Sequence, residues 1–329
     1  MLVDNHGRSI SYARLAVTDR CNLRCFYCMP EHGLEWLASK DLMTAAEMLR
    51  LCSLLTGMGI QKIRITGGEP FVRKDMMEVL TAIGKLPGLG ELTITTNGVL
   101  TAPFVPKLKK IGVRSVNISL DTLDRQRFLD ITHRDELPRV LETLDALDRH
   151  GIEIKINAVV MEGKNTQDIL ELVELTSNHP YHVRFIEEMP FNGQGSHYQT
   201  LGWNYVRILE SIRQAHPDIR KMEDPPHSTA YNYQIPGHRG KVGIIAAYSR
   251  TFCGTCNRIR ITPQGTLKTC LYDEGVLNLK VLMRKGLNDA DLQAALIRAF
   301  HARPKDGLEA EQKRKGHSEL HESMATIGG

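Results

Sequence analysis

The sequence lacks several features that would assign it to a common class of protein. It contains no run of about 18 apolar residues long enough to span a bilayer, and the N-terminal stretch MLVDNHGRSISYARL lacks the apolar segment of a secretory signal. No long basic block is interleaved with aromatic residues, and the net charge is only +4, which argues against a nucleic-acid-binding face. We therefore expect a cytoplasmic globular protein that binds neither membrane nor nucleic acid.

Cysteine is scarce as well, with seven residues in a chain of 329. An odd number in a reducing compartment argues against a disulfide framework. Six of the seven form two groups of three: Cys21, Cys25 and Cys28, then Cys253, Cys256 and Cys270. Cys52 stands apart among leucines on a predicted helix, where a core position is the simplest interpretation. Two groups of three thiols indicate two metal centres.

Short β-rich segments alternate with amphipathic helical stretches up to about residue 215. We predict strands at 12–18, 62–66, 91–97, 114–121, 153–160 and 182–189. Helices are predicted to begin near Thr44, Asp75, Pro103, Leu137, Thr166 and Trp203, the first with a capping box of Thr44 and Glu47. Such units form parallel sheets with right-handed crossovers. Because six strands are too few for a closed eight-stranded barrel, the predicted fold class is α/β, with an incomplete (β/α)6 TIM-type barrel.

The character of the sequence changes after this barrel. Residues 228–270 are β-rich, and the turn signal Pro263-Gln264-Gly265 predicts a hairpin. A helical stretch over 288–300 and a polar tail ending in MATIGG follow. We therefore expect residues 1–227 to form the partial barrel with the first metal centre. Residues 228–329 are expected to form a smaller β-rich C-terminal module with the second centre and the tail.

The predicted strands alternate between apolar and polar residues, although strands buried on both faces usually read as continuous apolar runs. If the apolar residues pack against the outer helices, the other set points into the barrel. That set is polar and cationic: Arg14, Arg64, Thr93, Thr95, Asn117, Ser119, Lys155, Asn157 and Arg184. Few acids share it, and buried unpaired cations are costly. The pattern predicts a site for a phosphorylated substrate; a half-exposed sheet with a solvated polar face is the alternative.

The first cysteine group has the spacing CxxxCxxC in the loop TDRCNLRCFYCMP. Three thiolates from one loop can hold a [4Fe-4S] cluster and leave its fourth iron without a protein ligand. That iron can chelate the amino and carboxylate groups of S-adenosylmethionine, which places the sulfonium beside the cluster for one-electron reduction. The alternative is a structural zinc site, but zinc prefers four ligands, commonly two CxxC pairs.

With Tyr27 before its last cysteine, this loop resembles the radical SAM superfamily. The sequence Gly67-Gly68-Glu69-Pro70, directly after the second predicted strand, is similar to the GGEP motif of that superfamily, which receives the methionine amino group. Alone, such a sequence would indicate only a turn. Together with the cysteine loop, it supports the same assignment.

The second cysteine group reads CxxC, then thirteen residues, then Cys, with the predicted hairpin between. Three thiolates can again hold a cluster, and a zinc site closed by a histidine is the alternative. Arg258 and Arg260 lie two apart on the strand predicted after Cys256, so both project from one face beside this group. They are suited to bidentate phosphate binding, with an ordinary solvated strand face as the alternative.

The combination of FCGTCNRIR, ITGGEP, TTNG, NISLD, IKINAVV and RFIEEMP resembles, over nearly the whole chain, the GTP 3',8-cyclase family of molybdenum-cofactor biosynthesis (MoaA type). The resemblance implies a lyase with two [4Fe-4S] clusters and S-adenosylmethionine. In this family a 5'-deoxyadenosyl radical removes the C3' hydrogen of GTP, and C3' then bonds to C8 of guanine. The product is (8S)-3',8-cyclo-7,8-dihydroguanosine 5'-triphosphate, formed in the first step of the pathway.

The resemblance also implies roles for particular residues. The clusters would be held by Cys21, Cys25, Cys28, Cys253, Cys256 and Cys270. Contacts to S-adenosylmethionine would come from Tyr27, Gly67, Gly68, Glu69, Ser119 and Met189. GTP would be bound by Arg14, Lys62, Arg64, Thr95, Lys155, Arg184, Arg258 and Arg260. The catalytic residues would be Arg258, Arg260 and the terminal Gly328 and Gly329, which would reach into the active site.

The partners implied by the resemblance are a low-potential electron donor such as a flavodoxin-type protein, a MoaC-type cyclic pyranopterin monophosphate synthase that takes the product, and a second copy of the chain in a homodimer. Two other hypotheses stay open at this point. One is a radical enzyme with an auxiliary cluster that modifies a peptide, against which the cationic lumen argues. The other is a zinc-stabilised binding module without catalysis.

Overall fold

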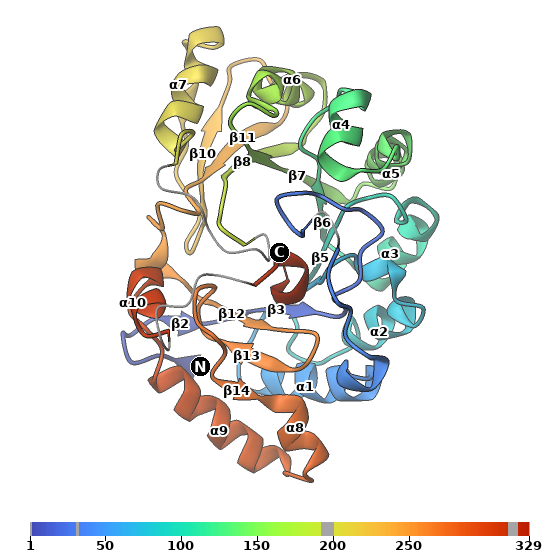
Figure 1. Cartoon of the computed structure of the whole chain (residues 1–329), viewed down its shortest axis with the longest axis vertical. Coiled ribbons are helices and arrows are strands. Elements are labelled where there is room, and N and C mark those ends of the chain that lie inside the picture. The colour runs from blue at the N-terminus through green and yellow to red at the C-terminus, as the bar shows by residue number, and fades with distance from the viewer. Residues whose placement is uncertain (1, 31–32, 192–200, 315–321, 329) are drawn as a thin grey trace.

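A curved sheet runs through the molecule, with most of the helices on its outer side (Figure 1). The structure is a computed structural model, and it describes residues 2–30, 33–191, 201–314 and 322–328. None of the helices in these ranges has the length and apolarity that a membrane crossing requires.

Over the described ranges, the main sheet contains twelve strands in the order β14-β13-β12-β3-β4-β5-β6-β7-β8-β11-β10-β9. Their bounds are β3 Tyr12–Ala16, β4 Lys62–Thr66, β5 Glu91–Thr96, β6 Ser115–Ser119, β7 Glu153–Val160, β8 His182–Glu187, β9 Arg220–Lys221, β10 Ala230–Gln234, β11 Lys241–Ile245, β12 Arg258–Ile261, β13 Thr266–Lys268 and β14 Leu277–Asn278. A separate hairpin pairs β1 Leu2–Val3 with β2 Ser9–Ile10. All neighbours from β12 through β11 pair in parallel.

The helices follow the strands as a β/α sheet requires. They are α1 Ala45–Gly57, α2 Met76–Ile83, α3 Val105–Ile111, α4 Arg125–Thr132, α5 Leu137–Arg149, α6 Ile169–Asn178, α7 Tyr205–Ala215, α8 Leu279–Arg284, α9 Asp289–His301, α10 Gly307–Gln312 and α11 Met324–Ile327. The predicted capping box of α1 is present, because the Thr44 side chain accepts from the Glu47 backbone and the Glu47 carboxylate accepts from the Thr44 backbone.

The predicted incomplete (β/α)6 barrel is confirmed: each of the six expected strands is present, and their apolar residues, such as Ile63, Ile94 and Phe185, are buried. Four of the described helices were not predicted: α8, α10 and α11 beyond the barrel, and α4 within it. The sequence of α4 is mostly polar and buries only Phe128, Ile131 and Thr132, so its helical periodicity is weak. Its start does carry a signal, since the Asp124 carboxylate caps the Arg127 backbone N–H at 2.8 Å.

Residues beyond 227 complete the barrel wall instead of forming a separate sheet. β11 pairs in parallel with β8 at one edge of the six-stranded core, and β12 pairs in parallel with β3 at the other. The hairpin predicted around Pro263 is present as the antiparallel pair β12 and β13. The proposed division of the chain at residue 227 stays a prediction.

The C-terminal helix α11 returns to the middle of the curved sheet (Figure 1). Three contacts place it there: Met324 N–H donates to the Phe191 carbonyl at 3.0 Å, the Ser323 hydroxyl donates to the Cys28 carbonyl, and the Arg260 guanidinium donates to the Gly328 carbonyl. The end of the described chain therefore lies beside both the first cysteine loop and β12.

Candidate active site

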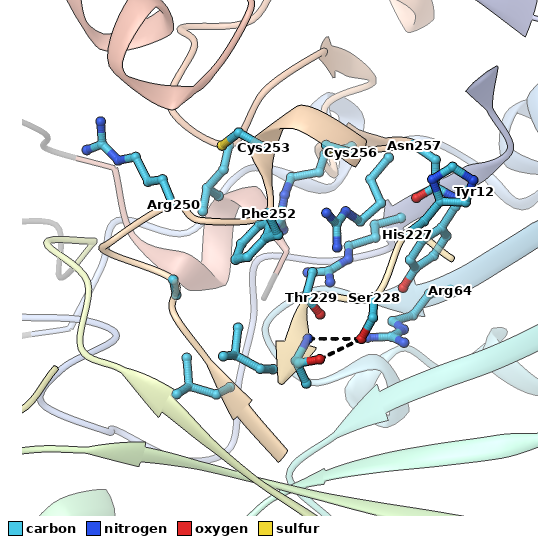
Figure 2. Close-up of a pocket in the computed structure, with 18 of the residues that line it drawn as sticks. Tyr12, Arg64, His227, Ser228, Thr229, Arg250, Phe252, Cys253, Cys256 and Asn257 are labelled. Carbon is cyan, nitrogen blue, oxygen red and sulfur yellow. Dashed lines mark hydrogen bonds between the residues drawn. The ribbon is translucent and has the colours of Figure 1, made fainter. Parts of the chain in front are cut away.

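A cavity of about 580 Å³ lies inside the curved sheet. Many of the site residues predicted from the sequence line this cavity: Arg14, Lys62, Arg64, Thr95, Lys155, Arg184, Met189, Cys253, Cys256, Arg258, Arg260 and Cys270. Figure 2 shows Phe252 and Cys253 on one side of this cavity and Tyr12 and Arg64 on the other. The inward orientation predicted from strand alternation is thus confirmed for the cationic residues.

Five arginines on the cavity wall have no carboxylate partner in the described parts of the chain: Arg14, Arg64, Arg184, Arg258 and Arg260. Nitrogens of three of them, Arg14 Nε, Arg184 Nε and Arg258 Nη2, are buried without a hydrogen-bond partner. Burial lowers the pKa of Arg64 to about 10 and that of Arg184 to about 9. This concentration of unpaired positive charge fits an anionic ligand with several phosphates.

The two cavity lysines that the sequence analysis predicted as substrate contacts, Lys62 and Lys155, are by contrast paired with carboxylates. Lys62 Nζ lies 2.8 Å from Glu91 Oε2, and Lys155 Nζ lies 3.1 Å from Glu153 Oε1. Few acids were expected among the inward-pointing residues, and these two were missed because they are the first residues of β5 and β7. They partly neutralise Lys62 and Lys155, whereas the five arginines named above have no such carboxylate among the described residues.

Tyr12 is a further residue of the cavity wall that no sequence motif indicated. Its ring lies 5.7 Å from the Arg14 guanidinium, 5.3 Å from Lys62 Nζ and 5.4 Å from the Arg64 guanidinium. Its hydroxyl is buried and has no hydrogen-bond partner among the described residues. Burial opposes ionisation of the phenol, but the charges of Arg64, Arg14 and Lys62 outweigh it and lower the pKa of Tyr12 to about 8.

The first cysteine loop follows β3, at the end of the barrel where active sites form. Cys21 Sγ accepts from Leu23 N–H at 3.4 Å and from Asn97 Nδ2 at 3.6 Å. Burial raises the pKa of Cys21 to about 12 and that of Cys28 to about 11. Buried thiols of this kind require a metal centre to become thiolates.

The Gly67-Gly68-Glu69 segment packs directly against the chain before the first cysteine. A Cβ on Gly68 would lie 2.3 Å from the Arg20 carbonyl oxygen and 2.6 Å from that of Asp19. The buried Glu69 carboxylate accepts from Asn97 N–H at 2.7 Å, Phe71 N–H at 3.0 Å and the Thr96 hydroxyl at 2.8 Å. Burial nevertheless raises the pKa of Glu69 to about 7.

Tyr27 and Ser119 lie apart from the large cavity. Together with Cys25, Asn97 and Asp121, they line a separate cavity of about 20 Å³. The Tyr27 hydroxyl donates to Asp121 Oδ2 at 2.8 Å. Among the other predicted site residues, Met189 lines the large cavity, and the Gly328 carbonyl accepts a hydrogen bond from Arg260. Gly329 lies outside the described residues.

The second cysteine group is surrounded by arginines. Arg303 Nη2 donates to Cys256 Sγ at 3.1 Å, and Arg8 Nη1 donates to the Cys253 carbonyl at 3.1 Å. Burial opposes ionisation of Cys256, but the charges of Arg258 and Arg303 outweigh it and lower the thiol pKa to about 6. The segment 225–229, whose His227 Nδ1 lies 2.8 Å from the Thr255 carbonyl oxygen, also lines the cavity and was not predicted.

The spacing of the thiols fits iron-sulfur clusters better than single zinc ions. Among the described residues, the only three-ligand group whose ligand atoms all lie within 4.8 Å of one another is Glu174, His216 and His238, outside both cysteine groups. Two thiolates on one zinc ion can be at most about 4.6 Å apart, twice the Zn–S bond of about 2.3 Å. A cluster that binds each thiolate to a different iron accepts a wider spacing.

The fold and the cysteine loop define the class of protein. The Radical SAM superfamily model matches residues 15–176, and the Molybdenum Cofactor Synthesis C model matches residues 181–308. A solved structure of SuiB from Streptococcus suis bound to S-adenosylmethionine superposes with a TM-score of 0.65 at 15% identity, covering 93% of this chain and 68% of that one, and shows the fold. The chain is a radical SAM enzyme.

The family follows from relatives of higher identity. The GTP 3',8-cyclase of Syntrophomonas wolfei is 38% identical over 340 residues, covering 100% of both proteins. Molybdenum cofactor biosynthesis protein 1 of Bos taurus is 41% identical over 292 residues, which are 88% of this chain and 46% of that protein, so the chain spans about half the length of that relative. The chain belongs to the GTP 3',8-cyclase family.

Proposed function

We propose that this chain converts GTP into (8S)-3',8-cyclo-7,8-dihydroguanosine 5'-triphosphate, the first step of molybdenum-cofactor biosynthesis. The observation that carries the proposal is the cavity itself, whose wall combines the second cysteine group with five arginines that have no carboxylate partner among the described residues. A nucleoside triphosphate supplies both the phosphates for the arginines and a base for the second group.

Each cysteine group would hold one [4Fe-4S] cluster: Cys21, Cys25 and Cys28 the first, and Cys253, Cys256 and Cys270 the second. When bound, the first cluster and S-adenosylmethionine supply a 5'-deoxyadenosyl radical that removes the C3' hydrogen of GTP. Gly67, Gly68, Glu69, Tyr27, Ser119 and Met189 are the proposed contacts to S-adenosylmethionine. Glu69 is suited to accept from an ammonium group because its carboxylate is buried and held by backbone N–H groups.

The barrel residues would hold and orient the triphosphate. Arg14, Lys62, Arg64, Thr95, Lys155 and Arg184 come from neighbouring strands and face one cavity, so they can contact several phosphates together. Arg258 and Arg260 would fix the nucleotide beside the second cluster. Strands also supply a rigid frame, and fixed geometry is the main contribution that a protein makes to radical chemistry.

The C-terminal tail would complete the site. Arg260 already donates to the Gly328 carbonyl, and α11 contacts the first cysteine loop through Ser323. Gly328 and Gly329 would therefore extend between the two cysteine groups and exclude water from the reacting atoms.

The proposed partners follow from the family. A low-potential donor such as a flavodoxin-type protein would reduce the clusters, and a MoaC-type cyclic pyranopterin monophosphate synthase would take the product. A homodimer and a cytoplasmic location are part of the same proposal.

The proposal is tested with anaerobically reconstituted, reduced protein and S-adenosylmethionine. We expect 5'-deoxyadenosine and a cyclised product with GTP, transfer of deuterium from C3'-labelled GTP to 5'-deoxyadenosine, and neither result for a Cys21→Ala variant. Guanosine without phosphates should give little product because the arginines lose their ligand. Release of 5'-deoxyadenosine without any product that depends on GTP would falsify the cyclase function and leave the radical SAM class intact.

A further inference from the structure

Arg303 makes an unusual set of contacts behind the second cysteine group. It follows α9, and 3% of its surface is exposed. All five guanidinium N–H donors are used: Nε to the Thr269 carbonyl at 2.9 Å, Nη1 to the Cys256 carbonyl at 3.0 Å and Asp4 Oδ2 at 3.2 Å, and Nη2 to the Arg258 carbonyl at 2.9 Å and Cys256 Sγ at 3.1 Å. One side chain thus connects the segments that carry Cys256 and Cys270.

The third cysteine of the group is connected to the same unit through the N-terminal hairpin. Asp4 Oδ2, which accepts from Arg303, also accepts from Arg8 Nε at 2.7 Å. Arg8 in turn donates to the Cys253 carbonyl at 3.1 Å and the Pro304 carbonyl at 2.9 Å. The Asp4 side chain is fully buried. The buried unit of Asp4, Arg8 and Arg303 therefore contacts the segments of all three cysteines.

The first cysteine group has no equivalent of this unit in the described chain. Among the described residues, the hydrogen-bond donors to sulfur in the first group are neutral, and the two donors to Cys21 Sγ, Leu23 N–H and Asn97 Nδ2, are longer, at 3.4 and 3.6 Å. Within the part of the chain that the structure describes, only the second group receives a cationic N–H donor on a sulfur. The two clusters therefore have different electrostatic surroundings.

We propose that Arg303 is a positioning residue of the second iron-sulfur site, which fixes the Cys256 thiolate and raises the reduction potential of the second cluster above the value it would otherwise have. The inference rests on the proposed assignment of the second cluster to Cys253, Cys256 and Cys270.

The direction of the effect follows from charge. Reduction adds an electron to the cluster, and a positive donor on a ligand sulfur stabilises the more negative state. The same bond fixes the direction in which Cys256 presents its sulfur. Because Asp4 holds the guanidinium from the far side, Arg303 cannot rotate away without breaking a buried ion pair.

The test compares Arg303→Gln and Arg303→Lys in the full-length, anaerobically reconstituted protein without GTP. Iron content and the reduction potentials of both clusters are measured by EPR-monitored titration, with signals assigned in a variant that lacks Cys21, Cys25 and Cys28. We expect Arg303→Gln to lower the ratio of reduced to oxidised second cluster at least tenfold at a fixed solution potential. For a one-electron couple this corresponds to a reduction potential that is lower by about 59 mV. The first cluster should not change.

Arg298→Gln is the matched control, because Arg298 lies exposed on α9 and should change neither potential. If Arg303→Gln selectively loses the second cluster, about four irons, while the first still binds S-adenosylmethionine, the positioning role is supported. If that variant does not fold, Arg303→Lys decides. Lysine keeps the positive charge but lacks the planar set of five donors, so a lower occupancy of the second cluster alone is expected. An intact second cluster with an unchanged potential in Arg303→Gln, or a fully occupied second cluster in Arg303→Lys where only that variant folds, overturns the proposal. Since GTP is absent, a failed cyclase assay does not affect this result.

Discussion

The Arg260 guanidinium donates a hydrogen bond to the backbone carbonyl of Gly328, although 68 residues separate the two in sequence. Gly328 has a φ of +79°, and a Cβ there would lie 2.9 Å from both Ala16 Cβ and Thr66 Cγ2. The tail therefore lies at the ends of β3 and β4, where only glycine fits. Arg260 is shared between the tail and the wall of the cavity that we propose for GTP.

Deleting residues 328–329 should slow cyclisation far more than it destabilises the fold. The tail contributes a hydrogen bond to a charged group, a contact worth about 1.5–3 kcal/mol, so the rate of product formation should fall at least about tenfold. The rate is measured with saturating GTP, and the thermal midpoint of the same preparation serves as control. Unchanged cyclisation after the deletion would show that the tail has no catalytic role.

Arg258→Ala should weaken GTP binding while both clusters stay in place. Its Nη2 is buried and no described residue accepts a hydrogen bond from it, so a phosphate is the group expected to accept one. Loss of a charge-assisted hydrogen bond should raise the Kd for GTP about tenfold or more. Arg284→Ala, which removes an exposed ion pair with Glu47, should leave the Kd unchanged. Loss of the second cluster in Arg258→Ala would mean that the arginine is structural.

Gly68→Ala should disrupt the first metal site alone. The new Cβ would meet the backbone oxygens of Arg20 and Asp19 at 2.3 and 2.6 Å, so the loop before Cys21 has to move. We expect loss of about four irons per chain and of S-adenosylmethionine binding, with the second cluster retained. Gly57→Ala is the control, since nothing lies within 4 Å of its Cβ position. A full iron content in Gly68→Ala would contradict the tight packing.

Binding of GTP should weaken as the pH rises through 8. The pKa of Tyr12 is lowered to about 8 by Arg64, Arg14 and Lys62 against the effect of burial, so its phenol ionises in this range. A phenolate repels phosphate and occupies the same cations, and by linkage bound triphosphate should raise the pKa of Tyr12. Between pH 7 and 8.5 the affinity should fall about fourfold, as measured by calorimetry. Tyr12→Phe should remove this dependence; a persisting decline would assign it to another group.

Glu91→Gln should tighten GTP binding. Glu91 Oε2 lies 2.8 Å from Lys62 Nζ, and the negative charge of Glu91 competes with the triphosphate for that lysine. Removing the charge should lower the Kd up to about fivefold, the scale of a partly exposed ion pair. Glu153→Gln is the matched comparison, because its side chain is 43% exposed against 25% for Glu91, and it should have the smaller effect. Weaker binding in Glu91→Gln would mean that the pair organises Lys62 for the substrate.

The sequence was informative where chemistry depends on local spacing. Strand alternation correctly predicted that Arg14, Arg64 and Lys155 face one cavity, because a period of two determines the side of a strand. It could not reveal that Asp4 pairs with Arg303, since 299 residues separate them and neither lies in a recognisable motif. The parallel pairing of β11 and β12 with the barrel edges was missed for the same reason.

The position of β11 and β12 at the two edges of the barrel affects how the chain folds during synthesis. A polypeptide that ends at residue 227 would leave β3 and β8 as open edges, and unpaired parallel edges invite aggregation. During synthesis these edges stay unpaired until residues 241–261 have left the ribosome. The wall that carries Arg14 and the wall that carries Arg184 therefore reach their final form only when the segment containing Cys253 and Cys256 is present, so substrate pocket and second metal site mature together.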